Sequence, residues 1–407
     1  MAGSALSQLL DFYAVTGPSI LTGPESIVNE AQERSYMLSW FLSGNGEGRL
    51  QGGNRIKDFI MFDAGNTAEF VLPGATRTYS NPQVVDEHAI DWRFLEDHMT
   101  FIDAEVELNM GGLSREAKFQ AFKRTMAIKE KRLATSLSNK MEAALFAQPD
   151  ATTMEGTTAA FTNPYSLFCF ANEFGGSSTA ETLTYGTGLP NGFTTIANLN
   201  PTTEAKWRPA QVGYAYGTAI DTTTVNASAA SLMNAFAITM RAVNYEPLPW
   251  KGGESTTNMA FGNDYVIACS LFGSVYFEKV QRASRDHFRQ YKTDPSWTGP
   301  WPDYNGIPVK HVALMDTAAV YPTSGTTAPA VGSGVVEMSG SAAFDGPRYM
   351  FLAKEWVKPV FQTNRYFYMR PDIVPSAQPD TTVKPVVCWY NFFPRSRRKL
   401  GFVYPTT

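Results

Sequence analysis

The strongest pattern of hydrophobic and polar positions lies in residues 114–147, where apolar side chains recur at spacings of three, four and seven. This spacing places them on one face of an α-helix. The face comprises Phe119, Phe122, Met126, Leu133, Leu137, Met141 and Ala144. Ser114 offers an N-cap, Pro149 follows the end, and no glycine or proline interrupts the stretch. The pattern therefore predicts a helix about 50 Å long.

The apolar stripe of this helix is narrow, because Ile128 points away from it and Glu130 falls inside it. A narrow stripe on a long charged helix indicates a strut lying across a sheet, rather than a helix buried on all sides. A coiled-coil arm is the alternative, although the heptad breaks at Lys129 and Glu130. A carboxylate inside the stripe needs a cationic or hydrogen-bonding partner, so Glu130 is a candidate interface residue.

Residues 49–109 have the alternation of extended strands. Residues 55–62 and 67–72 predict two strands, and the turn Asp63-Ala-Gly-Asn66 between them has hairpin chemistry. Their apolar runs are too long for one face of a half-buried strand, and a lone two-stranded ribbon is only marginally stable. We therefore expect a neighbouring subunit to cover this hairpin. The interface candidates are Lys57, Phe59, Phe62, Phe70 and Leu72.

The rest of the chain divides by pattern into an arm, a connection and a compact unit. Residues 1–48 predict an arm ending in a flexible glycine-rich joint, and residues 150–227 a long irregular connection. Residues 228–340 predict a self-contained α/β unit, and residues 341–407 return to strands. The elements expected in the α/β unit are helices at 229–243 and 271–283 and strands at 265–269 and 307–315.

Composition indicates a chain whose surface is covered by partners. Charged residues make up 18% and aromatic residues 13%, and the net charge of −4 argues against nucleic-acid binding by bulk electrostatics. The three cysteines are widely spaced and predict neither a disulfide framework nor a metal site. The first residues lack the pattern of a signal peptide, and no apolar run is long enough to span a membrane.

Catalytic and metal-binding chemistry is weakly represented. His88 and His98 lie among Asp86, Glu87, Asp91, Glu96 and Asp97, a set that could bind a metal but reads better as a solvated acidic stretch. No HExxH pair or GxSxG elbow is present, so the sequence predicts no enzyme, cofactor or metal. Arg395, Arg397 and Arg398 form a basic cluster with Lys399. We expect contact with another subunit there, with packaged DNA as the alternative.

Several short motifs occur in a characteristic order along almost the whole chain. They are Leu50-Gln-Gly-Gly53, Arg55-Ile-Lys-Asp58, Asn109-x-Gly111, Trp207-Arg208, Gly306-Ile-Pro-Val309 and Arg397-Arg398-x-x-Gly401. With the long helix, this order resembles the major capsid protein family of tailed bacteriophages, which has the Hong-Kong-ninety-seven-type fold. The resemblance implies an α+β fold. Its parts are an N-terminal arm (1–48), an extended loop (49–85), a peripheral domain with a spine helix (86–165), an axial domain (166–340) and a return to the peripheral domain (341–407).

The resemblance also implies a function and a set of partners. Copies of the chain would form pentamers and hexamers of an icosahedral shell in the virion, made in the bacterial host cytoplasm, around double-stranded DNA held without sequence specificity. A portal and a separate scaffolding protein are expected, because no long N-terminal scaffolding segment is present, and a decoration protein is left open. Family members can cross-link a lysine to an asparagine, for which Lys57 is a candidate. No feature identifies its partner, so we predict a non-covalent shell. The alternatives are an encapsulin-like compartment and a β-rich hydrolase.

Overall fold

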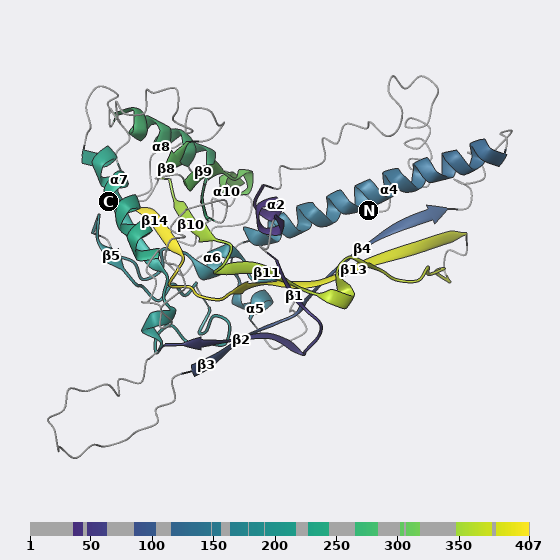
Figure 1. Ribbon diagram of the computed structural model, residues 1–407, viewed down its shortest axis with the longest axis horizontal. Coiled ribbons are helices and arrows are strands. Elements are labelled where there is room, and N and C mark those ends of the chain that lie inside the picture. The colour runs from purple at the N-terminus through teal and green to yellow at the C-terminus, as the bar shows by residue number, and fades with distance from the viewer. Residues whose placement is uncertain are drawn as a thin grey trace, which may run out of the picture.

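The computed structural model describes residues 36–43, 47–62, 85–102, 115–147, 149–155, 163–177, 179–190, 192–216, 227–243, 265–283, 302–304, 307–317, 347–376 and 380–406. In these ranges the chain has two main parts, a mixed sheet with helices and an elongated arm in which a long helix lies along a second sheet (Figure 1). Both helices and mixed sheets are present, which confirms the predicted α+β class. The predicted turn at 63–66, the interface candidates Phe70 and Leu72, and the motifs at 109–111 and 306 lie outside the described residues.

The first part is a seven-stranded sheet in the order β5-β6-β14-β10-β7-β9-β8. Its strands are β5 (Leu183–Thr184), β6 (Ala210–Ala215), β7 (Tyr265–Cys269), β8 (Asp303–Tyr304), β9 (Ile307–His311), β10 (Tyr349–Ala353) and β14 (Gly401–Thr406). Its helices are α7 (Ala227–Val243), α8 (Leu271–Ala283) and α10 (Ala313–Thr317). The rings of Phe236 on α7 and Phe277 on α8 stack at 5.2 Å and close one core over the sheet.

This sheet takes its central strands from the end of the chain. β10 is bonded to β7 on one side and to β14 on the other, although both β10 and β14 belong to residues 341–407. The expectation that residues 228–340 close their own core is therefore wrong for this sheet. Every residue of β10 is buried. A strand buried on both faces has no alternation that reveals which sheet it joins.

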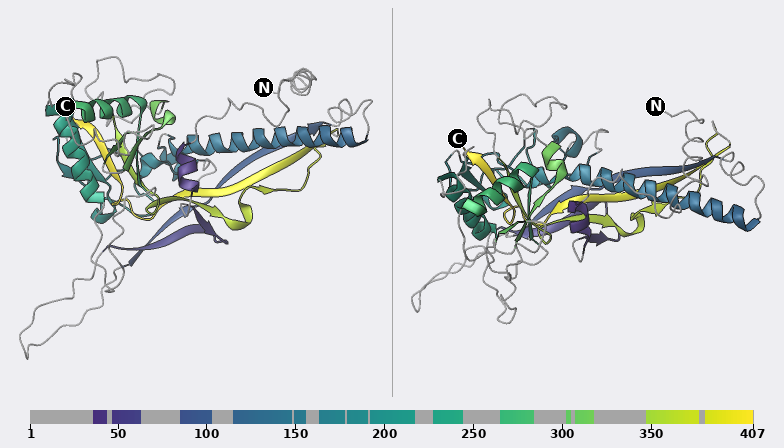
Figure 2. Two further views of the ribbon diagram at one scale, coloured as in Figure 1. Left: turned by 45° about the horizontal axis from the view of Figure 1, so that its top comes forward. Right: turned by 90° about the horizontal axis from the view of Figure 1, so that it is seen from above.

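The arm is built on β13 (Thr381–Pro394). Its sheet has the order β1-β11-β13-β12, and β4 also pairs with β13. The other strands are β1 (Gly48–Leu50), β4 (Arg93–Ile102), β11 (Val357–Gln362) and β12 (Tyr368–Met369). The long helix α4 (Arg115–Leu145) lies along this sheet (Figure 2), with Leu133 and Leu137 packed against Met99, Phe101 and Val386. The predicted strut across a sheet is thus confirmed.

A separate two-stranded ribbon is formed by β2 (Arg55–Met61) and β3 (Val85–Asp91). It lies apart from α4, on the other side of the arm sheet in Figure 2. β2 pairs with β3 along its whole length, from Arg55 opposite Asp91 to Met61 opposite Val85. The local strand pattern did not predict this longer-range pairing. The segment 67–72, which was expected to pair with 55–62, lies outside the described residues.

Short helices connect these parts. They are α2 (Tyr36–Leu42), α5 (Ala151–Met154), α6 (Leu167–Phe170) and the 3-10 helices η2 (Ala205–Trp207) and η4 (Thr363–Arg365). α2 packs on both α4 and β11, and the core beneath it includes Met37, Phe41, Met141, Leu145 and Phe361. Within the described ranges, no helix combines the length and apolar character needed to cross a membrane.

Candidate interaction surfaces

One face of the β2–β3 ribbon is exposed and changes from charged to apolar along its length. Arg55 pairs with Asp91 at 2.5 Å, and Lys57 pairs with Glu87 at 2.7 Å. Beyond these ion pairs come Phe59, 67% exposed, followed by Met61 and Val85, which are also exposed. The predicted interface residues Lys57 and Phe59 therefore lie on an open surface of the chain.

The opposite face of the ribbon is anchored on the body of the protein. His88 of β3 is fully buried between the rings of Phe393, at 4.7 Å, and Trp207, at 5.3 Å. Neither of its ring nitrogens makes a hydrogen bond of good geometry within the described residues. Burial lowers the pKa of His88, opposed in part by the nearby Asp58 carboxylate. This ring is part of the ribbon's attachment rather than of a metal site.

The base of the ribbon is fixed by the segment around Trp207. The buried indole donates a hydrogen bond from Nε1 to the Ile196 carbonyl at 3.1 Å, and the Lys206 ammonium donates to the Phe62 carbonyl. The side chain of Phe62 is itself buried, 6.1 Å from the Trp207 ring. The prediction that Phe62 is open to a neighbouring subunit is therefore wrong, because its own chain covers it.

The predicted basic cluster is dispersed. Arg395 pairs with Asp58 at 3.2 Å, which links the end of β13 to the ribbon, and the Arg398 guanidinium stacks 4.0 Å from the Tyr185 ring. Arg397 is completely buried and donates to backbone carbonyls of the core. These are Cys169, Phe170, Thr187, Gly188 and Trp207.

The fully buried Arg397 is a structural residue. Desolvation lowers the pKa of its guanidinium to about 9. Its expected role at a subunit interface is wrong, because it has no exposed surface. Arginine offers five N–H donors in a planar fork, which suits a site where several carbonyl groups converge. The sequence of the basic cluster does not show that Arg397 is buried while its neighbours Arg395 and Arg398 face solvent.

In the part of α4 whose side chains are described, Glu142 is a buried carboxylate. The expectation that Glu130 is buried in the apolar stripe is wrong, because Glu130 is exposed. Glu142 is only 3% exposed and accepts hydrogen bonds from the backbone N–H groups of Met37 and Leu38. Desolvation raises its pKa to about 7. The neighbouring Met141, Leu145 and Phe146 are also buried, so the stripe widens here to face α2 as well as the sheet.

The face of the arm sheet that points away from α4 carries a second exposed apolar surface. Phe94 of β4 is 61% exposed and lies edge-on to Trp389 of β13, with ring centroids 4.6 Å apart. The Arg365 guanidinium lies 5.2 Å from the ring of Tyr368 and 5.5 Å from that of Trp389. Two residues beyond Phe94, Glu96 faces Arg370 at 3.9 Å. We call this set the arm face.

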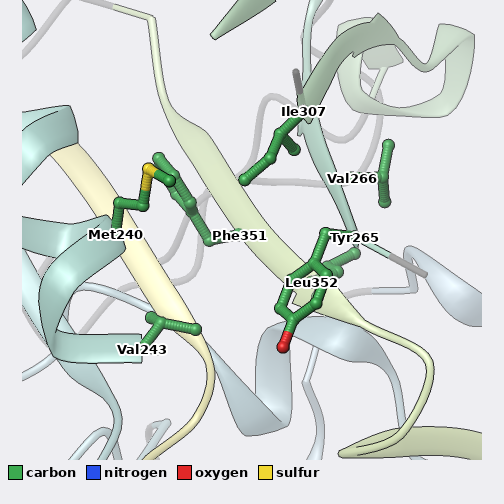
Figure 3. A pocket seen from close by; sticks show the side chains of 7 residues that line it. All are labelled: Met240, Val243, Tyr265, Val266, Ile307, Phe351 and Leu352. Carbon is green, nitrogen blue, oxygen red and sulfur yellow. The ribbon is translucent and has the colours of Figure 1, made fainter. Parts of the chain in front are cut away.

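The described part of the chain contains no cluster of three or more side chains that could hold a metal ion. Cys169 and Cys388 are buried, and burial raises the pKa of each thiol to about 11. A small cavity between α7 and the sheet is lined by Met240, Val243, Tyr265, Val266, Ile307, Phe351 and Leu352 (Figure 3). It leaves about 10 Å³ for the centre of a water-sized molecule, which is too little for an organic substrate.

No protein-family model and no curated protein matches this sequence. Solved structures resemble it over most of its length. The capsid of a native GTA particle is 12% identical, with a TM-score of 0.48, and each chain covers 100% of the other. The cyanophage A-1(L) capsid is 13% identical, with a TM-score of 0.44 over 93% of this chain and 97% of that one. The mature capsid of bacteriophage PhiM1 is 11% identical, with a TM-score of 0.43 over 89% and 86%. At identities and TM-scores this low, we take no residue role or partner from these structures.

Proposed function

We propose that this chain is the major capsid protein of a tailed bacteriophage, a structural protein whose copies form a closed icosahedral shell around double-stranded DNA. The observation that carries the proposal is the pair of exposed apolar surfaces on the two extended parts of the chain. One is the ribbon face with Phe59, Met61 and Val85, and the other is the arm face with Phe94 and Tyr368.

Exposed apolar surfaces that are rimmed by charged residues are typical of sites where proteins associate. A two-stranded ribbon is marginally stable by itself in water, and exposed apolar groups on it favour association. The ribbon and the arm face are separate surfaces. The ribbon of one copy can therefore bind the arm face of a second copy, while its own arm face binds the ribbon of a third. Contacts of this kind are heterologous, and they close into rings when the rotation between copies allows it.

The charges beside the two surfaces are complementary. On the ribbon, Lys57 lies two residues from Phe59 and faces Glu87. On the arm face, Glu96 lies two residues from Phe94 and faces Arg370. Laid together, the aromatic groups can pack while Lys57 meets Glu96 and Glu87 meets Arg370. Such rim charges give register and specificity more than raw affinity.

The proposed partners follow from this role. Copies would group as pentamers and hexamers in the virion, after synthesis in the host cytoplasm, with a portal, a scaffolding protein and an optional decoration protein. Genome contact would be without sequence specificity. The net charge of −4 and the dispersal of Arg395, Arg397 and Arg398 favour loose enclosure of DNA over tight binding.

Assembly of the purified protein tests the proposal. Sedimentation and negative-stain microscopy should reveal closed shells for the natural chain and unassembled subunits for Phe59→Ser combined with Met61→Ser. Leu271→Ser is the matched control, since it removes an exposed apolar side chain from α8 and should leave assembly unchanged. A natural chain that remains monomeric under all conditions would contradict the proposal. Particles from infected cells that protect protein cargo and no DNA would favour an encapsulin-like compartment instead.

A further inference from the structure

The short helix α2 is held at both ends by buried charged side chains from other elements. At its first turn, the Glu142 carboxyl group accepts hydrogen bonds from the N–H groups of Met37, at 3.2 Å, and Leu38, at 2.6 Å. At its last turn, the Lys354 ammonium donates to the Ser43 carbonyl at 3.2 Å and to the Ser43 hydroxyl at 2.9 Å. The Lys354 charge matches the negative end of the helix dipole, whereas burial disfavours the ionised form of Glu142 that the positive end would stabilise.

The two ends of this clamp differ in their environment. The Lys354 ammonium also lies 5.1 Å from the Trp40 ring, which gives it a second favourable contact. Glu142 lies beneath α2 in the apolar core formed by Met37, Met141 and Leu145. Burial penalises its ionised form, and the two N–H donors offset this only in part. Separation of α2 from α4 would return the carboxyl group to water and remove the penalty.

We propose that α2 is a proton-linked latch, which docks tightly when the Glu142 carboxyl group is protonated and loosens when that group ionises. The direction follows from linkage. A carboxyl group that binds its proton more tightly in the docked state than in the undocked state favours docking at low pH. The undocked carboxyl group titrates near its ordinary value, so docking weakens as the pH rises from about 4.5 to about 7.

No other charged group competes for control of this site in the described residues. The part of α2 from Met37 to Leu42 has no ionisable side chain. β11, which also packs on α2, contributes Lys358, but the charges that act on Lys358 are those of Arg395, Glu355 and Asp58. Among the described residues, the pKa of Glu142 is shifted by burial and by its hydrogen bonds from the two backbone N–H groups. Lys354 lies at the opposite end of the helix.

The consequence of the latch is a pH-dependent attachment of α2 to α4 and β11. The latch is independent of whether the protein forms shells, because every contact in it lies within one chain.

Hydrogen–deuterium exchange of the purified subunit tests the latch. Protection of the α2 amides, corrected for intrinsic exchange rates, should fall by about tenfold or more between pH 5 and pH 8. Amides of Val386 to Cys388 in β13 report global unfolding and should not share this slope. Glu142→Gln keeps an acceptor without a titrating proton, so its α2 protection should be the same at both pH values. Lys354→Met should lower the protection of the α2 amides by a factor that does not depend on pH.

Two results would overturn the latch. One is α2 protection in the natural chain that does not change between pH 5 and pH 8. The other is a Glu142→Gln variant that keeps the pH slope of the natural chain. If Glu142→Gln does not fold, the comparison of α2 with β13 amides in the natural chain still decides the matter.

Discussion

Lys57 on β2 and Glu87 on β3 form an ion pair, with 2.7 Å between Nζ and Oε1, immediately beside the exposed ring of Phe59. Both side chains are about half exposed, so within one chain the pair adds little to stability. Its position beside an uncovered apolar surface gives it another use. The pair presents one positive and one negative charge to which complementary charges on a second copy of the chain can bind.

Exchange of these two charges is the first prediction. Lys57→Glu with Glu87→Lys keeps the ion pair within the ribbon but reverses the pattern seen by a neighbour. We expect an unchanged melting temperature and a clear rise in the concentration needed for assembly, because like charges would then face Glu96 and Arg370. Adding Glu96→Lys and Arg370→Glu should restore assembly. A ribbon with exchanged charges that assembles like the natural chain would rule out this docking arrangement.

His88 carries the second prediction, on the pH dependence of stability. Its folded pKa is lowered, so the unfolded state binds more protons below about pH 6.5, and the free energy of unfolding falls as the pH drops through that range. His88→Phe should flatten this part of the profile. It should also raise stability at pH 5 by about 1 kcal/mol, because a buried polar ring is replaced by an apolar one. Urea denaturation between pH 5 and pH 8 measures both effects, and an unchanged slope would mean that His88 is not the group responsible.

Arg397 carries the third prediction. Arg397→Met leaves the carbonyl groups of Cys169, Gly188 and Trp207 without their donor, and we expect a loss of about 3 kcal/mol or more in the free energy of unfolding. Arg398→Met is the matched control, since it removes only a stacking contact with Tyr185 and should cost less than about 1 kcal/mol. Equal losses for the two variants would show that burial of Arg397 contributes nothing beyond that of a surface arginine.

The sequence predicted those features that depend on local pattern. The helical stripe through Leu133, Leu137 and Met141 identified α4 and its position across a sheet, and the strand patterns identified β2 and β7. Pairing over long distances was not predicted. The pairing of β2 with β3, for example, spans more than twenty residues of intervening chain, and the local strand pattern does not specify a partner at that distance.

The residues of the candidate site were also predicted only in part. Lys57 and Phe59 lie on the exposed face of the ribbon, so their role at a subunit interface stays a prediction. Phe62 and Arg397 were mistaken for interface residues, because a buried side chain and an interface side chain have the same chemistry in sequence. Glu142 was missed, because its partners are backbone N–H groups of α2, and backbone donors have no signature in the sequence.

Hydrogen exchange of the β2 amides, compared between free subunits and assembled particles, tests the proposed shell most directly. If a neighbouring copy covers the ribbon face of Phe59 and Met61, these amides should exchange more slowly in the particle than in the free subunit, where the chain itself anchors only the opposite face. Amides of Val386 to Cys388 in β13 should be protected in both states and serve as the internal reference. Equal protection of β2 in the free subunit and the particle would contradict the account, because the ribbon would then be held by its own chain alone.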